Sequence, residues 1–235
     1  MRTEAVAWIV TLFALVPGAG GIAWYWHRVV PLLEQAGHEA CAVDLPGDDE
    51  RAGFAVYADR VVAAIGSHSD VALVAQSLGG FTAPLVAARI PLRMLVLVNA
   101  MIPLPGETAG AWGKATGSAA ARAAAARAGG YSEEFEDETY FFHDLSRDIV
   151  AEAERHERPQ SERIFEDACA FEAWPDIPIH VIAGRDDRLF PIAFQRRVAR
   201  DRLGASVDEL PGGHLLALSH PHALVEQLLG YSRAR

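Results

Sequence analysis

The sequence predicts an α/β protein, a doubly wound and mostly parallel sheet with a helical lid inserted into it. Nearly continuous apolar runs of strand length recur along the chain. Continuous runs, unlike alternating ones, are typical of strands buried on both faces of a parallel sheet. Helix-like stretches separate the runs, as expected of strand–helix–strand units. A long stretch without a strand pattern, residues 101–175, divides the predicted core into residues 1–100 and 176–235.

Five runs are predicted to be strands, and they are Ile9–Val16, Ala40–Val43, Val71–Ala75, Met94–Val98 and Ile179–Ala183. The first run lies in "MRTEAVAWIVTLFALVPGAGG", where one arginine followed by apolar residues also resembles a weak secretion signal. Glu4 near its start and the lack of an A-x-A cleavage site favour a core strand. The run is also too short to span a membrane.

Amphipathic spacing predicts the helices of the core, at Val29–Ala36, Phe54–Gly66, Leu78–Arg89, Ile192–Leu203 and Ala223–Leu229. Residues 101–175 contain the tract "AAARAAAARAGG" and the acidic, aromatic stretch "YSEEFEDETYFFHDLSRDIV". Alanine favours helix, so we expect a mostly helical lid over an active site; a helical excursion without function is the alternative. Four aromatic residues are candidates for an apolar pocket or, equally, for core packing: Trp112, Tyr140, Phe141 and Phe142.

Composition limits the classes of partner. The 235 residues include 21 basic and 31 acidic side chains, a formal net charge of −10. An acidic surface disfavours sequence-independent binding to nucleic acid or to anionic membranes. The two cysteines, Cys41 and Cys169, indicate neither a disulfide framework nor a metal site, and we expect both to be buried thiols.

The stretch "VALVAQSLGG" ends a predicted strand on Ser77. A serine on a sharp strand-to-helix turn can act as a nucleophile, and its neighbours must be small because the backbone is strained and the helix packs closely. Ala75 and Gly79 stand at the two small positions, with alanine where the G-x-S-x-G pattern has glycine. The alternative is a serine that caps the helix starting at Leu78.

Three further loops carry candidate chemistry. "LVPGAGGIAWYW" does not complete a dinucleotide-binding G-x-G-x-x-G pattern, because Ala23 takes the third glycine's place, but its backbone could donate an N–H to an oxyanion. "VIAGRDDRLFP" places two acids after a strand, although a solvated turn would look the same. "ELPGGHLLALSHP" offers His214 in a loop, while His220 and His222 flank a helix start and are interpreted as structural.

The order of these features is more specific than any one of them. Glycine loop, serine, acid and histidine follow one another, each at the carboxyl end of a predicted strand. Ligands of open α/β sheets bind at that edge. A serine needs a general base, an acid that orients the base and amide donors for the oxyanion, and this set supplies all of them.

The chain resembles the α/β-hydrolase superfamily, especially the small esterases grouped with plant methyl-salicylate esterases and hydroxynitrile lyases, and their bacterial relatives. The resemblance is strongest at "LVPGAGGIAWYWHRVVPLLEQAGHEACAVDLPG", "LVAQSLGG", "GRDDRLFP" and "LPGGHLLALSHP". It implies Ser77 as nucleophile and His214 as base. The family pattern G-x-x-D-x-x-x-P selects Asp187 over its neighbour Asp186 as the acid. The implied oxyanion donors are the backbone N–H groups of Ala19 and Leu78.

The chain departs from the family at several places. Pro17-Gly18 replaces the usual His-Gly, and Gln76 replaces the histidine before the nucleophile. Hydroxynitrile lyases of this group carry a threonine where Gly18 stands and a lysine where Leu215 stands, so the resemblance favours hydrolysis. A dehalogenase would have aspartate in place of Ser77. The implied function is cytoplasmic hydrolysis of a small carboxylic ester through an acyl-enzyme, without metal or organic cofactor. A lyase using the same three side chains and a small-ligand receptor are the alternatives, and oligomeric state is not predicted.

Overall fold

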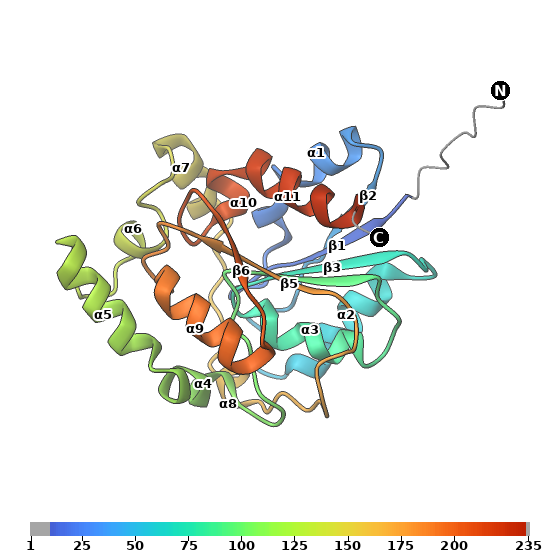
Figure 1. Ribbon diagram of the computed structural model, residues 1–235, viewed down its shortest axis with the longest axis horizontal. Coiled ribbons are helices and arrows are strands. Elements are labelled where there is room, and N and C mark those ends of the chain that lie inside the picture. Colours follow the sequence, from blue (N-terminus) through green and yellow to red (C-terminus); the bar gives the residue numbers. More distant parts are fainter. Residues whose placement is uncertain (1–9, 234–235) are drawn as a thin grey trace.

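A computed structural model describes residues 10–233, and these form a six-stranded sheet flanked by helices (Figure 1). The strand order is β2-β1-β3-β4-β5-β6, and all neighbouring strands run parallel. The bounds are β1 (Leu12–Val16), β2 (Glu39–Ala42), β3 (Val71–Gln76), β4 (Met94–Val98), β5 (Ile179–Gly184) and β6 (Val207–Leu210). The predicted α/β class and the parallel sheet are confirmed.

Helices cover both faces of the sheet, which makes it doubly wound (Figure 1). One face carries the 3₁₀ helix η1 (Ala23–Trp26), α1 (Val30–Gln35), α10 (Leu216–Ser219) and α11 (Pro221–Arg233). The other carries α2 (Phe54–Ile65), α3 (Gly79–Ala87) and α9 (Ile192–Leu203). Successive residues of β1 enter opposite clusters: Phe13 packs with the first group of helices and Ala14 with the second. Burial on both faces explains why the strand runs are continuously apolar.

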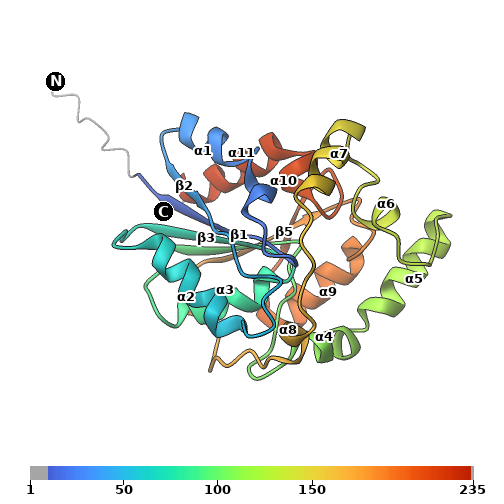
Figure 2. The same ribbon diagram turned by 180° about the vertical axis from the view of Figure 1, so that it is seen from behind.

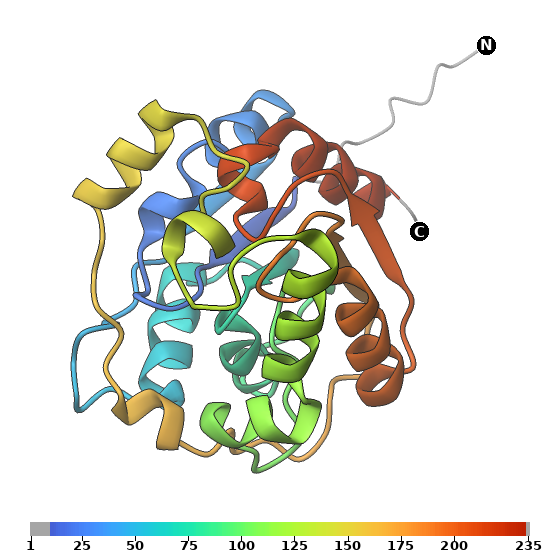
Figure 3. The same cartoon turned by 90° about the vertical axis from the view of Figure 1, so that its left-hand side faces the viewer.

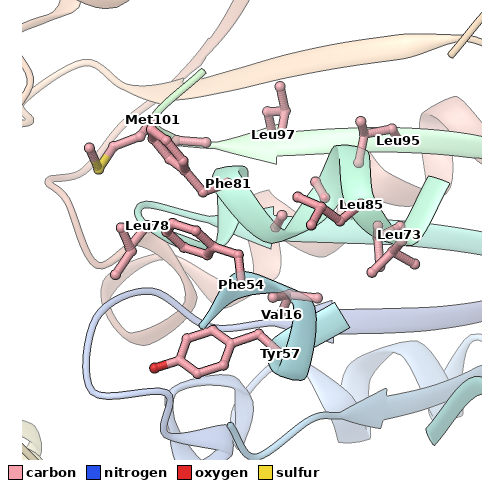
Figure 4. Packing of buried hydrophobic residues seen from close by; sticks show 14 of the residues in the cluster. Val16, Phe54, Tyr57, Leu73, Leu78, Phe81, Leu85, Leu95, Leu97 and Met101 are labelled. Atoms are coloured by element: carbon pink, nitrogen blue, oxygen red, sulfur yellow. The ribbon is translucent and has the colours of Figure 1, made fainter. Parts of the chain in front are cut away.

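The cluster between the sheet and helices α2 and α3 supports the turn that follows β3 (Figure 4). Phe54 stacks on Phe81 with ring centroids 5.1 Å apart, and both side chains are fully buried. Burial of a phenylalanine contributes roughly 1.5–3 kcal/mol. Because Phe81 lies in the first turn of α3, this packing fixes the start of that helix, which begins two residues after Ser77.

Residues 101–175, here called the cap segment, contain five helices between β4 and β5. They are α4 (Ala109–Thr116), α5 (Ser118–Gly129), α6 (Asp137–Tyr140), α7 (Arg147–Arg155) and α8 (Arg163–Glu166). Figure 1 places α5, α6 and α7 beyond the carboxyl ends of the strands, and Figure 3 looks onto that end with the green and yellow helices in front. Figure 2 shows α7 beside α10, above the sheet edge. The predicted helical character of this segment is present.

Some boundaries and side-chain placements differ from the predictions. The first strand begins at Leu12, and Ile9 lies outside the described residues. β6 has the sequence VDEL and was not among the predicted runs, because this edge strand is not apolar. Cys169 is buried, but Cys41 is only half-buried since β2 is the other edge, so the expectation of two buried thiols was wrong for Cys41. Across residues 10–233, no helix combines the length and apolarity needed to cross a bilayer.

Candidate active site

Ser77 occupies a strained turn between β3 and α3. Its φ of 51° lies in the left-handed region, which few residues other than glycine adopt. Such strain costs on the order of 1–3 kcal/mol and persists only where surrounding structure holds it. Here Ser77 N–H donates to the Val98 carbonyl at 3.2 Å, and Met101 N–H donates to the Ser77 carbonyl at 2.9 Å. No side chain caps α3, so Ser77 is not serving as its N-cap.

Close backbone contacts around this turn explain its small residues. A Cβ on Gly79 would lie 2.6 Å from the Pro17 carbonyl oxygen, and one on Gly80 would lie 2.0 Å from that of Met101. Either contact would force the backbone apart. Ala75 is completely buried within the core cluster, so the structure accommodates a methyl group where the usual pattern has glycine.

The structure brings Ser77, His214 and Asp187 together from the ends of three strands. His214 Nε2 lies 3.0 Å from Ser77 Oγ, and His214 Nδ1 lies 2.8 Å from Asp187 Oδ2. His214 is 1% exposed and Asp187 is 4% exposed, so both groups are shielded from solvent. The neighbouring Asp186 is exposed and instead accepts a hydrogen bond from Gly212 N–H. The geometry therefore favours Asp187 over Asp186 as the partner of the imidazole.

Asp187 accepts three hydrogen bonds besides the one from His214. Its Oδ1 receives the N–H groups of Leu189 and Phe190, both at 2.9 Å. Its Oδ2 receives Gln195 Nε2 at 3.1 Å, on the same oxygen that faces His214. Gln195 is 5% exposed and comes from α9. Both oxygens of this buried carboxylate are therefore hydrogen-bonded within the protein.

Asn99 links the same network to the histidine loop. Its Nδ2 donates to the carbonyls of Gly213 and His214 at 3.1 and 2.9 Å, and its Oδ1 accepts from Gly184 N–H and from Gln195 Nε2 at 2.7 and 3.2 Å. Asn99 is fully buried with a φ of 45°. Neither side chain was predicted from the sequence. Asn99 directly follows an apolar run, and that position is a signal that could have been used. Gln195 lies inside a helix, and no sequence pattern marks it as part of the site.

The first glycine loop packs directly against Ser77. A Cβ on Gly18 would lie 2.4 Å from Gln76 Oε1 and 2.8 Å from Ser77 Cβ. Within residues 10–233, neither the N–H of Ala19 nor that of Leu78 has a hydrogen-bond acceptor. Both predicted oxyanion donors are thus free of protein partners, one in the loop after β1 and one directly after Ser77.

A cavity of about 370 Å³ opens over these groups. Ser77, His214 and Ala19 line it, together with residues of the cap segment. Its other walls combine aromatic and acidic side chains, which are Trp24, Tyr25, Phe141, Phe142, Asp137, Glu138, Glu154 and Glu157. Burial raises the pKa of Tyr25, so its phenol stays neutral.

Two of the four predicted pocket aromatics line the cavity. Phe141 and Phe142 do, and the Phe141 ring centroid lies 5.4 Å from that of His214. For Trp112 and Tyr140 the other alternative, core packing, holds. Trp112 is 1% exposed and packs in the core, where its Nε1 donates to the Ile102 carbonyl at 3.0 Å. Tyr140 is fully buried and stacks on a neighbouring ring within the cap segment.

Across residues 10–233, no group of three or more histidine, cysteine or acidic side chains is arranged to hold a metal ion.

Comparison with known proteins decides the family. The model of the "Alpha/beta hydrolase family" matches residues 13–227, which is most of the chain. The chain belongs to the alpha/beta hydrolase family. Two similar curated relatives of this hydrolase are polyneuridine aldehyde esterase of Rauvolfia serpentina, 34% identical over 108 residues, and an alpha-hydroxynitrile lyase of Arabidopsis thaliana, 37% identical over 103 residues. These matches cover 41% and 39% of the chain and 41% and 40% of the relatives, so they span about two fifths of each protein.

Solved structures agree over nearly the full length. A pyrethroid hydrolase from Sphingobium faniae JZ-2 superposes on this hydrolase with a TM-score of 0.77 at 23% identity, covering 96% of this chain and 98% of that one. A mutant of polyneuridine aldehyde esterase gives a TM-score of 0.76 at 24% identity, covering 95% and 100%. At these identities the likeness shows the fold, and the family and fold predicted from the sequence are confirmed.

Proposed function

We propose that this hydrolase cleaves small carboxylic esters through an acyl-enzyme intermediate. The observation that carries the proposal is the hydrogen-bonded chain Ser77–His214–Asp187 at the floor of a cavity. The curated relatives support it, since several carry names of esterases, among them polyneuridine aldehyde esterase and methylesterase 9 of Arabidopsis thaliana.

In the first half of the proposed reaction, Ser77 Oγ attacks the ester carbonyl carbon. His214 Nε2 takes the hydroxyl proton, and Asp187 holds the imidazole in the tautomer that leaves Nε2 free to accept it. The oxyanion is stabilised by the N–H groups of Ala19 and Leu78. Removal of one such donor typically costs about 10²–10³ in rate. The intermediate collapses as the imidazolium gives its proton to the leaving alcohol.

In the second half, water replaces the alcohol. His214 removes a proton from the water, the hydroxide oxygen bonds to the acyl carbon, and a second tetrahedral intermediate forms in the same amide pair. Its collapse breaks the bond to Ser77 Oγ, which regains the proton from His214, and releases the carboxylic acid. The three side chains return to their starting protonation states, so no redox or metal chemistry is needed.

The cap segment acts as the lid in this proposal, because its helices lie beyond the carboxyl ends of the strands and its residues line the cavity together with Ser77 (Figure 3). A wall that excludes water strengthens the electrostatic interactions around the oxyanion. The remaining proposals concern context: a small-molecule ester as substrate, no binding of nucleic acid, and a cytoplasmic location. The net charge of −10 supports the second of these.

A lyase and a receptor are the competing functions. The lyase would need a cation near the leaving group, but Leu215, which directly follows His214, places an apolar side chain in the cavity. A receptor would not need the strained turn at Ser77, whose φ of 51° costs stability without improving affinity. Both observations favour hydrolysis.

The test combines labelling and turnover. A fluorophosphonate probe followed by peptide mapping should modify Ser77 and no other serine, and Ser77→Ala should lower kcat for p-nitrophenyl acetate by about 10⁴-fold or more. Equal rates for the two proteins would remove Ser77 from the mechanism. Absence of labelling and turnover on a panel of methyl, acetyl and longer acyl esters, together with tight binding of a small molecule, would indicate a receptor.

A further inference from the structure

The cavity above Ser77 is rimmed by carboxylates that have no cationic partner. Asp137 and Glu138 come from α6, Glu154 from α7, and Glu157 from the chain that follows it. Within residues 10–233, none of the four lies within ion-pair distance of a basic side chain. All four residues are exposed, and all four line the cavity.

Among the described residues, Arg158 is the arginine that lines the cavity, and it does not neutralise this rim. Arg158 Nη2 pairs with Asp44 Oδ2 at 2.9 Å, and its Nη1 donates to the Leu45 carbonyl at 2.6 Å. Its charge is therefore matched by a carboxylate outside the cavity lining. Partial burial, and then the charges of Glu157 and Glu138, raise the pKa of Asp137, so these three carboxylates lie close enough to interact.

The walls below the rim suit the same kind of ligand. Tyr25, Phe141 and Phe142 present aromatic rings to the cavity, and aromatic faces attract ammonium groups. Beside Ser77, Gln76 lines the cavity while being only 3% exposed. Its Nε2 donates to the His214 carbonyl at 3.5 Å, and its Oε1 accepts no hydrogen bond from residues 10–233. This unpartnered oxygen is not sealed inside the core, so it adds one free hydrogen-bond acceptor to the cavity wall beside Ser77.

We propose that the cavity selects esters carrying a cationic ammonium group and discriminates against esters carrying a carboxylate. The inference rests on the function proposed above, because it names the substrate class of the same site. The ester carbonyl would lie at Ser77, the apolar part of the substrate would contact the rings, and the ammonium group would face the acidic rim formed by Asp137, Glu138, Glu154 and Glu157.

A matched pair of substrates isolates the charge. Acetylcholine and 3,3-dimethylbutyl acetate have the same shape but differ by one positive charge, and monomethyl glutarate supplies the anionic case. At low ionic strength we expect kcat/KM to be about tenfold higher for acetylcholine than for its neutral isostere, and lowest for the anion. The preference should shrink at 1 M salt, where the Debye length is about 3 Å. Assays at pH 8 keep ordinary imidazoles uncharged.

Matched variants connect the preference to the rim. Glu157→Gln should lower the ratio of kcat/KM for acetylcholine to that for the isostere about threefold. Glu134→Gln makes the same change in net charge at an exposed residue outside the cavity, and it should leave the ratio unchanged. If both variants lower the ratio equally, the effect belongs to the net charge of the protein and the proposal for the rim is wrong.

A binding measurement separates this inference from the hydrolase function. Calorimetric titration of Ser77→Ala with phenyltrimethylammonium and with benzoate reads the charge preference without turnover, and the cation should bind at least tenfold more tightly. Hydrolysis of all three esters with equal kcat/KM would overturn the cationic preference and leave the hydrolase intact. Tight binding of the cation without hydrolysis of any ester would overturn the hydrolase and keep the preference. Binding of neither ion would overturn the preference.

Discussion

Asp187→Asn is the substitution for which the structure makes the most specific prediction. The change keeps size and shape but replaces one acceptor oxygen by a donor NH₂ group. Because Oδ1 of Asp187 faces the N–H groups of Leu189 and Phe190, both at 2.9 Å, an NH₂ placed there would oppose two donors. The amide oxygen must therefore take the Oδ1 position, and the NH₂ group must take the position of Oδ2.

The consequence is a change of tautomer at His214. The new NH₂ group would face His214 Nδ1, which now lies 2.8 Å from Oδ2, and could only donate to it. His214 would then carry its proton on Nε2 and could not accept one from Ser77 Oγ at 3.0 Å. Loss of the correct tautomer in a serine triad lowers kcat by about 10⁴-fold. Gln195 Nε2 would also oppose the new NH₂, and loss of this charged hydrogen bond should cost about 1.5–3 kcal/mol of stability.

The assay compares kcat/KM for p-nitrophenyl acetate at pH 8 with thermal melts of the same preparations. Asp186→Asn is the matched control, because Asp186 is exposed and contacts Gly212 N–H instead of the imidazole. We expect Asp186→Asn to keep at least a third of the wild-type kcat/KM. A folded Asp187→Asn variant that keeps more than a tenth of the activity would refute the tautomer argument, and so would equal losses in both variants.

Two further predictions concern the buried network and pH. Gln195→Met preserves volume but removes the hydrogen bond to Asp187, so the free energy of unfolding should fall by about 2–4 kcal/mol. We also expect kcat to fall by a larger factor than KM changes. An unaltered kcat in a variant that remains stable in urea would contradict a positioning role for Gln195. Burial lowers the pKa of His143 and His180, so below about pH 6.5 the unfolded chain binds more protons than the folded one and stability decreases as pH falls. Urea unfolding at pH 7.5 and 5.5 measures the change in unfolding free energy, and we expect a smaller change for His180→Gln than for the wild type.

The core of the fold was predictable because its strands are buried on both faces. The run at 94–98 was assigned with its observed bounds, since every residue of β4 is buried. β6 was not predicted, because its sequence VDEL at the sheet edge contains two acids and gives little apolar signal. Edge strands need less apolar sequence, since neighbours cover them on one side only. The same reasoning explains why Cys41, on the other edge strand, is not fully buried.

The site was predictable to the extent that it follows from chain order. Residues that end parallel strands must meet at one edge of the sheet, so Ser77 and the acids after β5 could be placed together without coordinates. His214 follows β6, a strand that was not predicted, and the choice of Asp187 over Asp186 came from the resemblance to the family. The walls of the cavity could not be predicted, because Trp112 and Phe141 look alike in the sequence. Only the path of the cap segment decides which ring lines the cavity. The role of Gln195 could not be predicted for a related reason. A polar residue on a helix ordinarily faces solvent, and only the packing of α9 turns this one inward.

These differences suggest that chemistry and selectivity are encoded in separate parts of the chain. The proposed reacting groups lie at the ends of sheet strands, where backbone hydrogen bonds and a buried amide network constrain them. The acidic rim comes from the cap segment, from exposed positions between Asp137 and Glu157 that contribute little to stability. Substitutions there can change charge without disturbing the core, because exposed positions usually alter stability by less than about 0.5 kcal/mol. The charge of the rim is therefore free to vary with the substrate while the hydrogen-bonded chain below it stays the same.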